Sequence, residues 1–129
     1  MRYLVDTSSL SYAFRDDSLR LRTLIRNLGL DQLAVSVMSV LEIEFGLEQR
    51  RVRRAPAIRE FLSQFEAIPF GTEDARLAAR LRATIAARGE TVGLMDTLIA
   101  AQALTRDLTL LTQDLAEFSR IPSLRVIAL

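Results

Sequence analysis

Four acidic residues are the best candidates for chemistry in this sequence, because each lies beside or inside an apolar segment: Asp6, Glu42, Asp96 and Asp114. The chain contains no His and no Cys, which excludes imidazole bases, cysteine nucleophiles and thiolate zinc sites. An enzyme of this composition has to work with carboxylates, hydroxyls and arginines. Because sites built from carboxylates alone suit Mg²⁺ or Mn²⁺, the chemistry indicated is metal-assisted.

Asp6 ends a short segment, residues 3–6, whose first three side chains are apolar or strand-favouring, as in a buried parallel strand. Ligands of open α/β sheets bind beyond the carboxyl ends of the strands, and a buried carboxylate without a partner is costly. The alternative role is a cap for the following helix, although Thr7, Ser8 or Ser9 could serve there as well. Since aspartate is depleted in strands, we favour the functional interpretation.

Glu42 lies inside a predicted helix over residues 38–49. At about 100° per residue, Glu44 and Glu48 share one face of that helix, which we expect to be solvated. Glu42 points roughly opposite, toward the interior side. On this pattern alone, an edge position with a snorkelling side chain fits as well as a functional carboxylate.

Asp96 and Asp114 both have a structural alternative. Asp96 stands in the first turn of a very apolar helix, residues 94–105, where an acid can cap the helix, favour its macrodipole, and still be presented to a metal. Asp114 follows a predicted strand as Asp6 does, but Asp114 and Glu117 have the spacing of a capping box, and Thr112 could cap too. Asp114 by itself therefore fits a cap as well as a site.

The four acids make a stronger pattern together than apart. Asp6 and Asp114 are expected at the carboxyl ends of strands, and the helices carrying Glu42 and Asp96 could flank the same edge of the sheet. Carboxylates gathered there would repel one another by about 4 kcal/mol per close pair at an effective dielectric constant near 20. A bound divalent cation relieves that repulsion, so the pattern predicts a metal site.

Hydrophobic periodicity divides the chain into alternating strands and helices with short connections. Strands are predicted over residues 3–6, 33–36, 67–70, 108–112 and 124–129. Helices are predicted after the first strand, over residues 19–28, 38–49, 72–88 and 94–105, in a segment that starts near Pro56 and carries Ile58, Phe61, Leu62 and Phe65, and as a turn over 114–118. Ser18 is the expected cap of the helix over 19–28, and Gly29 its stop. The prediction is a single domain over residues 1–129, with a three-layer α/β fold and a mostly parallel central sheet flanked by helices.

Composition bounds the setting. The net charge is +1, so there is no global electrostatic argument for nucleic acid. No apolar run is long enough to span a bilayer, and the N-terminus leads straight into a strand without a signal peptide, so we expect a cytoplasmic protein. The one basic run holds Arg50, Arg51, Arg53 and Arg54. It fits an RNA phosphate guide or a solvated turn between helices, and we favour the turn.

Taken in order, these motifs resemble those of the PIN-domain family, and within it the VapC-type ribonuclease toxins. The resemblance runs through residues 4–8, 36–47, 93–101, 111–114 and 118–122 and so covers essentially the whole chain. It implies that Asp6, Glu42, Asp96 and Asp114 form the acidic site, with Asp6 and Asp96 as direct metal ligands. Thr112 matches a hydroxyl position of the family. Ser8 and Asp114 stand at positions where relatives have Asn. Whether Ser8 keeps the contact to the Asp6 region, and whether the charge of Asp114 is required, therefore stays open.

The resemblance also implies a function: a metal-dependent endoribonuclease that uses Mg²⁺ or Mn²⁺ to hydrolyse RNA, forms a homodimer and is inhibited by a cognate VapB antitoxin. The antitoxin would lie across the apolar helices, where Leu41, Phe45, Phe61, Leu62 and Phe65 form either its groove or, in part, ordinary core. Two alternatives stand beside it. One is a PIN-fold nuclease of RNA maturation without an antitoxin, and the other is a non-catalytic PIN-like binding module.

Overall fold

A computed structural model describes residues 1–16 and 19–129. The strands are β1 (Tyr3–Val5), β2 (Leu33–Ser36), β3 (Glu66–Ile68), β4 (Thr109–Thr112) and β5 (Val126–Ala128). The helices are α1 (Thr7–Asp16), α2 (Leu19–Leu28), α3 (Val37–Arg50), α4 (Ala55–Ser63), α5 (Thr72–Ala87), α6 (Leu94–Thr105) and α7 (Leu115–Phe118), with a short 3₁₀ turn over Leu30–Gln32. None of these helices is long and apolar enough to cross a membrane.

The strands form one five-stranded sheet in the order β3-β2-β1-β4-β5, and every neighbouring pair is parallel. β1 is the central strand, and its last residue, Val5, pairs with Val35 of β2 and Leu111 of β4. Asp6 therefore leaves the middle of the carboxyl edge, the position at which open α/β sheets bind their ligands.

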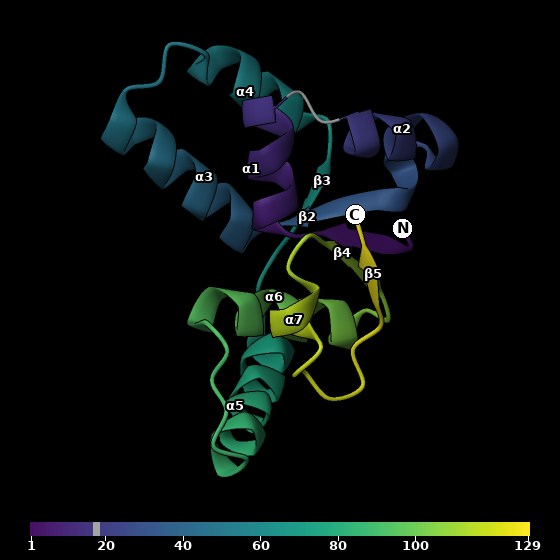
Figure 1. The fold of residues 1–129 in the computed structure, drawn as a ribbon, viewed down its shortest axis with the longest axis vertical. Helices are drawn as coiled ribbons and strands as arrows, with labels where there is room; N and C mark the ends of the chain where they lie inside the picture. Colours follow the sequence, from purple (N-terminus) through teal and green to yellow (C-terminus); the bar gives the residue numbers. More distant parts are fainter. Residues whose placement is uncertain (17–18) are drawn as a thin grey trace.

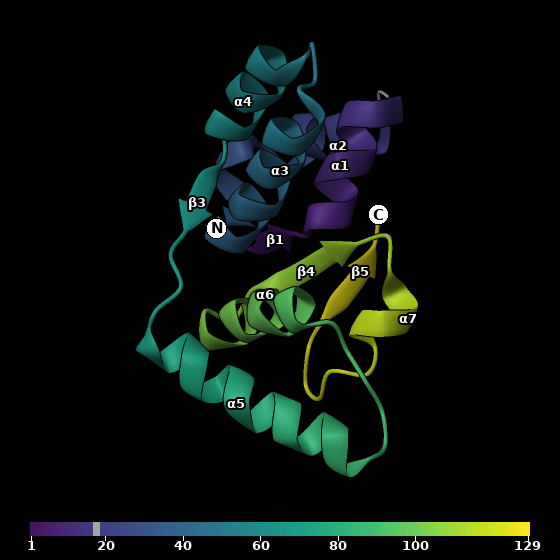
Figure 2. The same cartoon turned by 90° about the vertical axis from the view of Figure 1, so that its left-hand side faces the viewer.

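Helices cover both faces of the sheet, so the predicted three-layer architecture is confirmed, with a sheet that is wholly rather than mostly parallel (Figures 1 and 2). Alternation along the strands assigns the side chains to the layers. Leu4, Ala34 and Leu110 face α5 and α6. Val5 and Leu111 belong to the other core, with α1 to α4.

Most predicted elements are confirmed, several at both ends: β2 over 33–36, α2 over 19–28 and α6 over 94–105. Gly29, the expected stop of α2, has φ of 89°, a left-handed conformation that favours glycine. β3 ends before the predicted 67–70 segment does, because Pro69 has no N–H to continue the ladder. α4 ends at Ser63, so Phe65 lies beyond the helix to which it was assigned. Ser18, the expected cap of α2, lies outside the described residues.

Candidate active site

Asp6 is buried at the carboxyl end of β1, with 2% of its surface exposed. Its carboxylate accepts hydrogen bonds from the Ser8 hydroxyl at 2.8 Å and from the Ser9 N–H at 3.0 Å. The Thr112 hydroxyl, from the end of β4, donates to the same carboxylate oxygen as Ser8 does. The Ser9 contact is the capping bond of α1, so Asp6 both caps that helix and faces the sheet edge. Ser8 and Thr112, predicted as supporting residues, both contact it.

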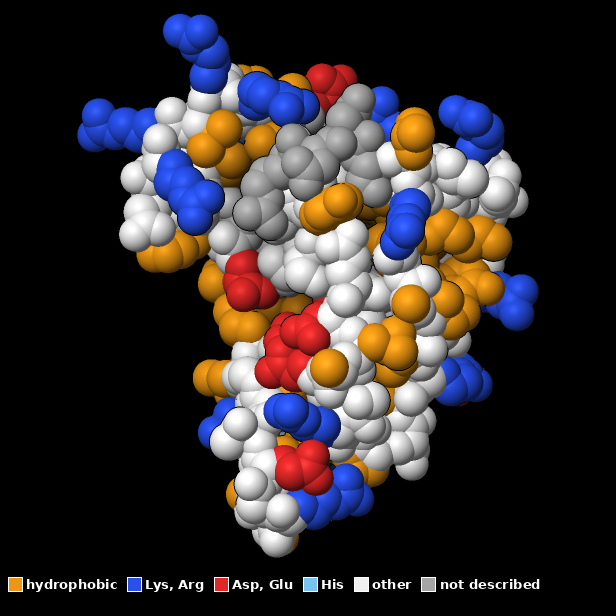
Figure 3. Space-filling model, in the orientation of Figure 1, with side chains coloured by type: hydrophobic (Ala, Val, Ile, Leu, Met, Phe, Trp, Pro, Cys, Tyr) orange, Lys and Arg blue, Asp and Glu red, His pale blue; other side chains and the backbone are white. Residues whose placement is uncertain are grey.

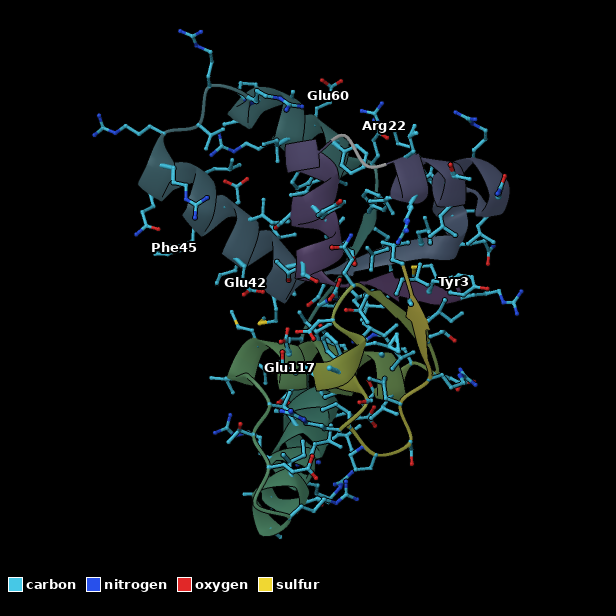
Figure 4. All side chains as sticks on the ribbon, viewed as in Figure 1. Tyr3, Arg22, Glu42, Phe45, Glu60 and Glu117 are labelled. Carbon is cyan, nitrogen blue, oxygen red and sulfur yellow. The ribbon has the colours of Figure 1, made fainter. Side chains whose placement is uncertain are left out.

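Glu42 is held beside Asp6 by hydroxyl groups. The Thr7 hydroxyl donates to Glu42 Oε1 at 2.8 Å. Because the Thr7 proton is used there, the hydrogen bond of 2.7 Å between Thr7 and Ser39 leaves Ser39 as the donor. Thr7 directly follows Asp6, so this chain of hydroxyls ties the first helical turns of α3 to the end of β1. Figure 4 shows Glu42 at the end of α3 nearest to α7.

The surface pattern expected for α3 is confirmed. Glu44 and Glu48 lie on the solvated side, and both bind Arg59 of α4, at 3.0 and 3.1 Å. These two acids therefore form ion pairs at the surface, and Glu42 is the acid of α3 that faces the site.

Asp96 shares the site with Glu117, a residue of α7. Burial is the main cause that raises the pKa of Asp96 to about 8, followed by its hydrogen bond with Glu117 and by the charges of Glu117, Asp6 and Glu42. Glu117 moves the other way: the hydrogen bond with Asp96 and the Gly93 N–H, at 2.8 Å, lower its pKa. Because the charges of Asp6 and Glu42 also act on Asp96, these acids lie near one another. Figure 3 shows exposed acidic side chains between α3 and α7.

Asp96 does not cap α6. The cap position is Gly93, whose own N–H donates to Glu117, and Asp96 makes no capping hydrogen bond there. The carboxylate of Asp96, in the first turn, is directed to Glu117 instead. The capping alternative is therefore wrong for Asp96, and its side chain is available to the site.

Asp114 takes the capping role that its spacing allowed. Its side chain is exposed and accepts from the Glu117 N–H at 3.3 Å at the start of α7, and its own N–H donates to Thr112. Sequence reasoning missed Glu117 as a site residue because the capping-box spacing assigned it to the backbone. A second signal was available in the sequence, where Glu117 directly precedes the large aromatic residue Phe118. Because Phe118 is buried, it fixes the direction in which the neighbouring Glu117 side chain points.

The segment around α7 fixes the loop before α6. Phe118 and Ile121 are 1% and 4% exposed and pack into the core shared with α5 and α6. Arg120 donates to the Thr91 carbonyl at 2.9 Å, and Glu117 accepts from Gly93. The loop that leads into Asp96 is thus held at two points.

The donor set fits a hard divalent cation in its chemistry. Its ligands would all be carboxylate oxygens. Burial is the main cause of the raised pKa of Asp96, and the charges of its acidic neighbours add to it. Among the described residues no three acidic side chains stand close enough to form a finished metal cage. Mg²⁺ needs no such cage, because it retains waters and is held by one or two carboxylates together with substrate phosphates. Asp6 and Asp96 are the two that face the site from β1 and α6.

The apolar set expected to meet an antitoxin divides into two parts. Leu62 and Phe65 are 7% and 5% exposed and belong to the core, while Leu41 and Phe45 of α3 are 55% and 64% exposed. The expectation that part of this set is ordinary core is thus confirmed. Leu41 and Phe45 remain as surface.

The PIN domain family matches residues 3–124 of the chain. The tRNA(fMet)-specific endonuclease VapC of Salmonella typhimurium is 27% identical over 98% of this chain and 96% of its own length. Ribonuclease VapC2 of Rickettsia felis is 30% identical over 96% of this chain and 95% of its own length.

Solved structures agree with this match. The structure of DNA-bound VapBC from Salmonella typhimurium contains a chain that superposes with a TM-score of 0.93 at 27% identity, covering 99% of this chain and 98% of that one. VapBC2 from Rickettsia felis, bound to a promoter DNA fragment, gives a TM-score of 0.88 at 25% identity, covering 100% and 99%. With the acidic site at the expected edge of the expected sheet, the chain belongs to the PIN-domain family and, within it, to the VapC ribonucleases.

Proposed function

We propose that this protein is a VapC-type endoribonuclease that hydrolyses RNA phosphodiester bonds with a divalent cation, Mg²⁺ or Mn²⁺, and acts in the cytoplasm. The observation that carries the proposal is the convergence of Asp6, Glu42, Asp96 and Glu117 at the carboxyl edge of β1. Gathered acids are unfavourable without a cation, and the hydroxyl groups of Thr7, Ser8 and Thr112 hold the carboxylates in that arrangement.

Each residue has a role that its contacts support. Asp6 and Asp96 would hold the cation, with the Asp6 carboxylate fixed by Ser8 and Thr112. Glu42, fixed by Thr7, accepts the proton of the attacking water. Glu117 orients Asp96 through their hydrogen bond. When bound, the cation lowers the pKa of the water and offsets the charge that develops on the phosphate.

Asp114 has a smaller role in this proposal. Its carboxylate caps α7, so it acts by positioning Glu117, and its negative charge is not required.

Cleavage of an RNA panel in Mg²⁺ tests the proposal, with tRNA included because a relative is named as a tRNA-specific endonuclease. Asp6→Asn and Asp96→Asn should each lower the rate by at least about a hundredfold, since each removes a direct ligand of the cation. Asp107→Asn is the matched control, because the Asp107 side chain is 90% exposed and precedes β4, at the edge of the sheet opposite to Asp6. Equal cleavage by all four proteins would point to a contaminating nuclease and overturn the assignment.

We also propose that a VapB-type antitoxin inhibits the enzyme and that the chain forms a homodimer. The neighbouring solved structures are VapBC complexes. Leu41, Phe45 and Leu94 are exposed by 55%, 64% and 54% and supply apolar surface for such contacts beside the acidic site. A nuclease of RNA maturation without an antitoxin is disfavoured by the same neighbours, and a non-catalytic module by the intact set of acids.

A further inference from the structure

A groove runs away from the acidic site between α1, α3 and α4. Its volume is about 380 Å³, within the size range of small-molecule sites. Along α3, Glu42, Gly46 and Arg50 border it about one turn apart, so that Glu42 lies toward the acidic site and Arg50 toward the other end. Ser11 and Phe14 of α1 and Arg54 also line the groove. The site and the groove therefore share one wall, the side chain of Glu42.

Gly46 is unusual for its position. It lies inside α3, where glycine is the poorest helix former after proline, and a Cβ built there would have no atom within 4 Å. Gly46 is therefore not required for close packing within the chain. What the missing side chain does is leave the groove open.

The charges along the groove follow a fixed order. Glu42 lies at the end next to the acidic site, Arg50 lies two helical turns farther along α3, and Phe14 of α1 lies beside Arg54. Arg50 is exposed and makes no hydrogen bond or ion pair with any residue that the structure describes. Arg54 donates to the Phe14 carbonyl at 3.2 Å, which holds it against α1.

We propose that this groove binds one nucleoside of the RNA strand, with its base against Phe14, next to the phosphate that is cut at the acidic site. The next phosphate along the strand then lies at Arg50 and Arg54. The order of Glu42, the open space at Gly46 and Arg50 along α3 matches the order of scissile phosphate, nucleoside and phosphate. Phe14, which lines the same groove, offers the aromatic side chain on which an unstacked base gains binding energy. The inference rests on the nuclease function proposed above and adds a base-selective subsite to it.

The subsite also distinguishes between the arginines of the basic run over residues 50–54, which the sequence treated as one group. Arg50 and Arg54 line the groove, whereas Arg51 and Arg53 do not. Of the run, the two lining arginines guide phosphate, and the other two belong to the solvated turn.

The test fills the groove and measures RNA binding apart from cleavage. Gly46→Leu puts a side chain into the open space and replaces a poor helix former with a good one, so its melting temperature should not fall. A fluorescent single-stranded RNA pool, randomised in sequence, is titrated without divalent cations so that no cutting occurs. We expect binding to Gly46→Leu to weaken about tenfold through loss of base stacking, with Gly46→Ala close to wild type.

A charge-matched pair checks the far end. Arg50→Gln should weaken binding and reduce its salt dependence, while Arg53→Gln, which removes the same charge outside the groove, should change both less. In Mg²⁺, sequencing of the cut ends should show that Gly46→Leu loses the base preference at one nucleotide beside the cut. Steady-state kinetics should show a raised KM for this variant.

The outcomes separate the subsite from the nuclease. If wild type binds the pool more tightly than Gly46→Leu but does not cut, the nuclease proposal fails and the subsite stands. If Gly46→Leu binds and cuts like wild type, the subsite is overturned. The subsite is overturned as well if Gly46→Leu loses only its inhibition by the antitoxin, because the groove would then be a peptide site.

Discussion

Hydroxyl side chains, rather than additional charges, determine how the carboxylates of this site are presented. Ser8 and Thr112 donate to Asp6, and Thr7 donates to Glu42. A neutral donor fixes a carboxylate and keeps its charge, whereas an arginine in the same place would neutralise it and compete with a cation. The carboxylates of the site therefore keep their negative charge and are also held in fixed positions.

Thr7→Val tests this principle, because valine keeps the shape of threonine and removes the hydroxyl. Glu42 then loses its only side-chain donor among the described residues, and kcat should fall about tenfold, the rate equivalent of about 1.4 kcal/mol and close to the lower value of a hydrogen bond to a charged group. Thr7→Ser restores the donor and should restore most of the rate in a single-turnover assay with RNA. Equal rates for Thr7→Val and wild type would show that Glu42 needs no such support.

Single residues were predictable from sequence where local rules agreed with the tertiary role. Asp6 follows a strand, and Glu42 lies opposite the solvated face of its helix. Both patterns can be recognised from residues that are close together in the sequence. Glu117 could not be found in this way, because its side chain accepts a hydrogen bond from the backbone N–H of Gly93, 24 residues earlier in the chain. A contact of that range is fixed only after α7 docks through Phe118.

Among the secondary-structure elements, α5 and α6 are joined by a buried ion pair behind the site. Asp74, 2% exposed, binds Arg106 at 2.7 Å and also accepts from Thr105 and from the Gly71 N–H. Burial alone would raise the pKa of Asp74, but the hydrogen bonds from Arg106, Gly71 and Thr105 outweigh it and lower the pKa. This pair fixes α6, which carries Asp96 at its other end.

Arg106→Met should reduce the free energy of unfolding by about 3 kcal/mol at neutral pH, because it leaves a buried carboxylate without its cation. Arg125→Met is the control, since the pair that it breaks, with Asp107, is exposed by 58% and 90% and should be worth less than about 1 kcal/mol. Urea unfolding of both variants measures the difference. A lowered pKa contributes stability that is lost as pH falls, so the gap between Arg106→Met and wild type should narrow below about pH 4.

The bounds of the elements were predictable where a residue itself stops or starts the backbone pattern. Gly29 ends α2 as predicted, whereas Ser36, which was predicted only as the last residue of β2, also caps α3 by accepting from the Met38 N–H at 2.9 Å. The edge strands were predicted too long, since β5 covers Val126–Ala128 and not 124–129. An edge strand ends where its neighbour stops offering partners, and one strand's sequence does not contain that information.

For the whole molecule, the acidic site makes stability depend on pH. Because the pKa of Asp96 is raised to about 8, the folded protein binds more protons than the unfolded chain between about pH 4 and about pH 8. Without divalent cations, the melting temperature should therefore fall as pH rises from about 5 to about 8 and level off above that. Calorimetry in a chelating buffer measures it, and Asp96→Asn should give a flatter profile.

Mg²⁺ should oppose this fall of the melting temperature at higher pH. A cation binds the deprotonated carboxylates and stabilises the folded state by mass action, so the rise in melting temperature on adding Mg²⁺ should be larger near pH 8 than near pH 6. Asp6→Asn should lose most of that rise. A wild-type protein whose melting temperature is indifferent to Mg²⁺ at both pH values would contradict a metal site at this edge.

The placement of β1 in the centre of the sheet has a consequence for biosynthesis. Asp6 lies 106 residues before Thr112, which donates to it from the end of β4, and Glu117 of α7 comes later still. During translation the central strand therefore first lacks β4, one of its two neighbours, and the acidic site lacks α7, one of its walls. The catalytic arrangement can form only after the segment that carries Glu117 has left the exit tunnel of the ribosome.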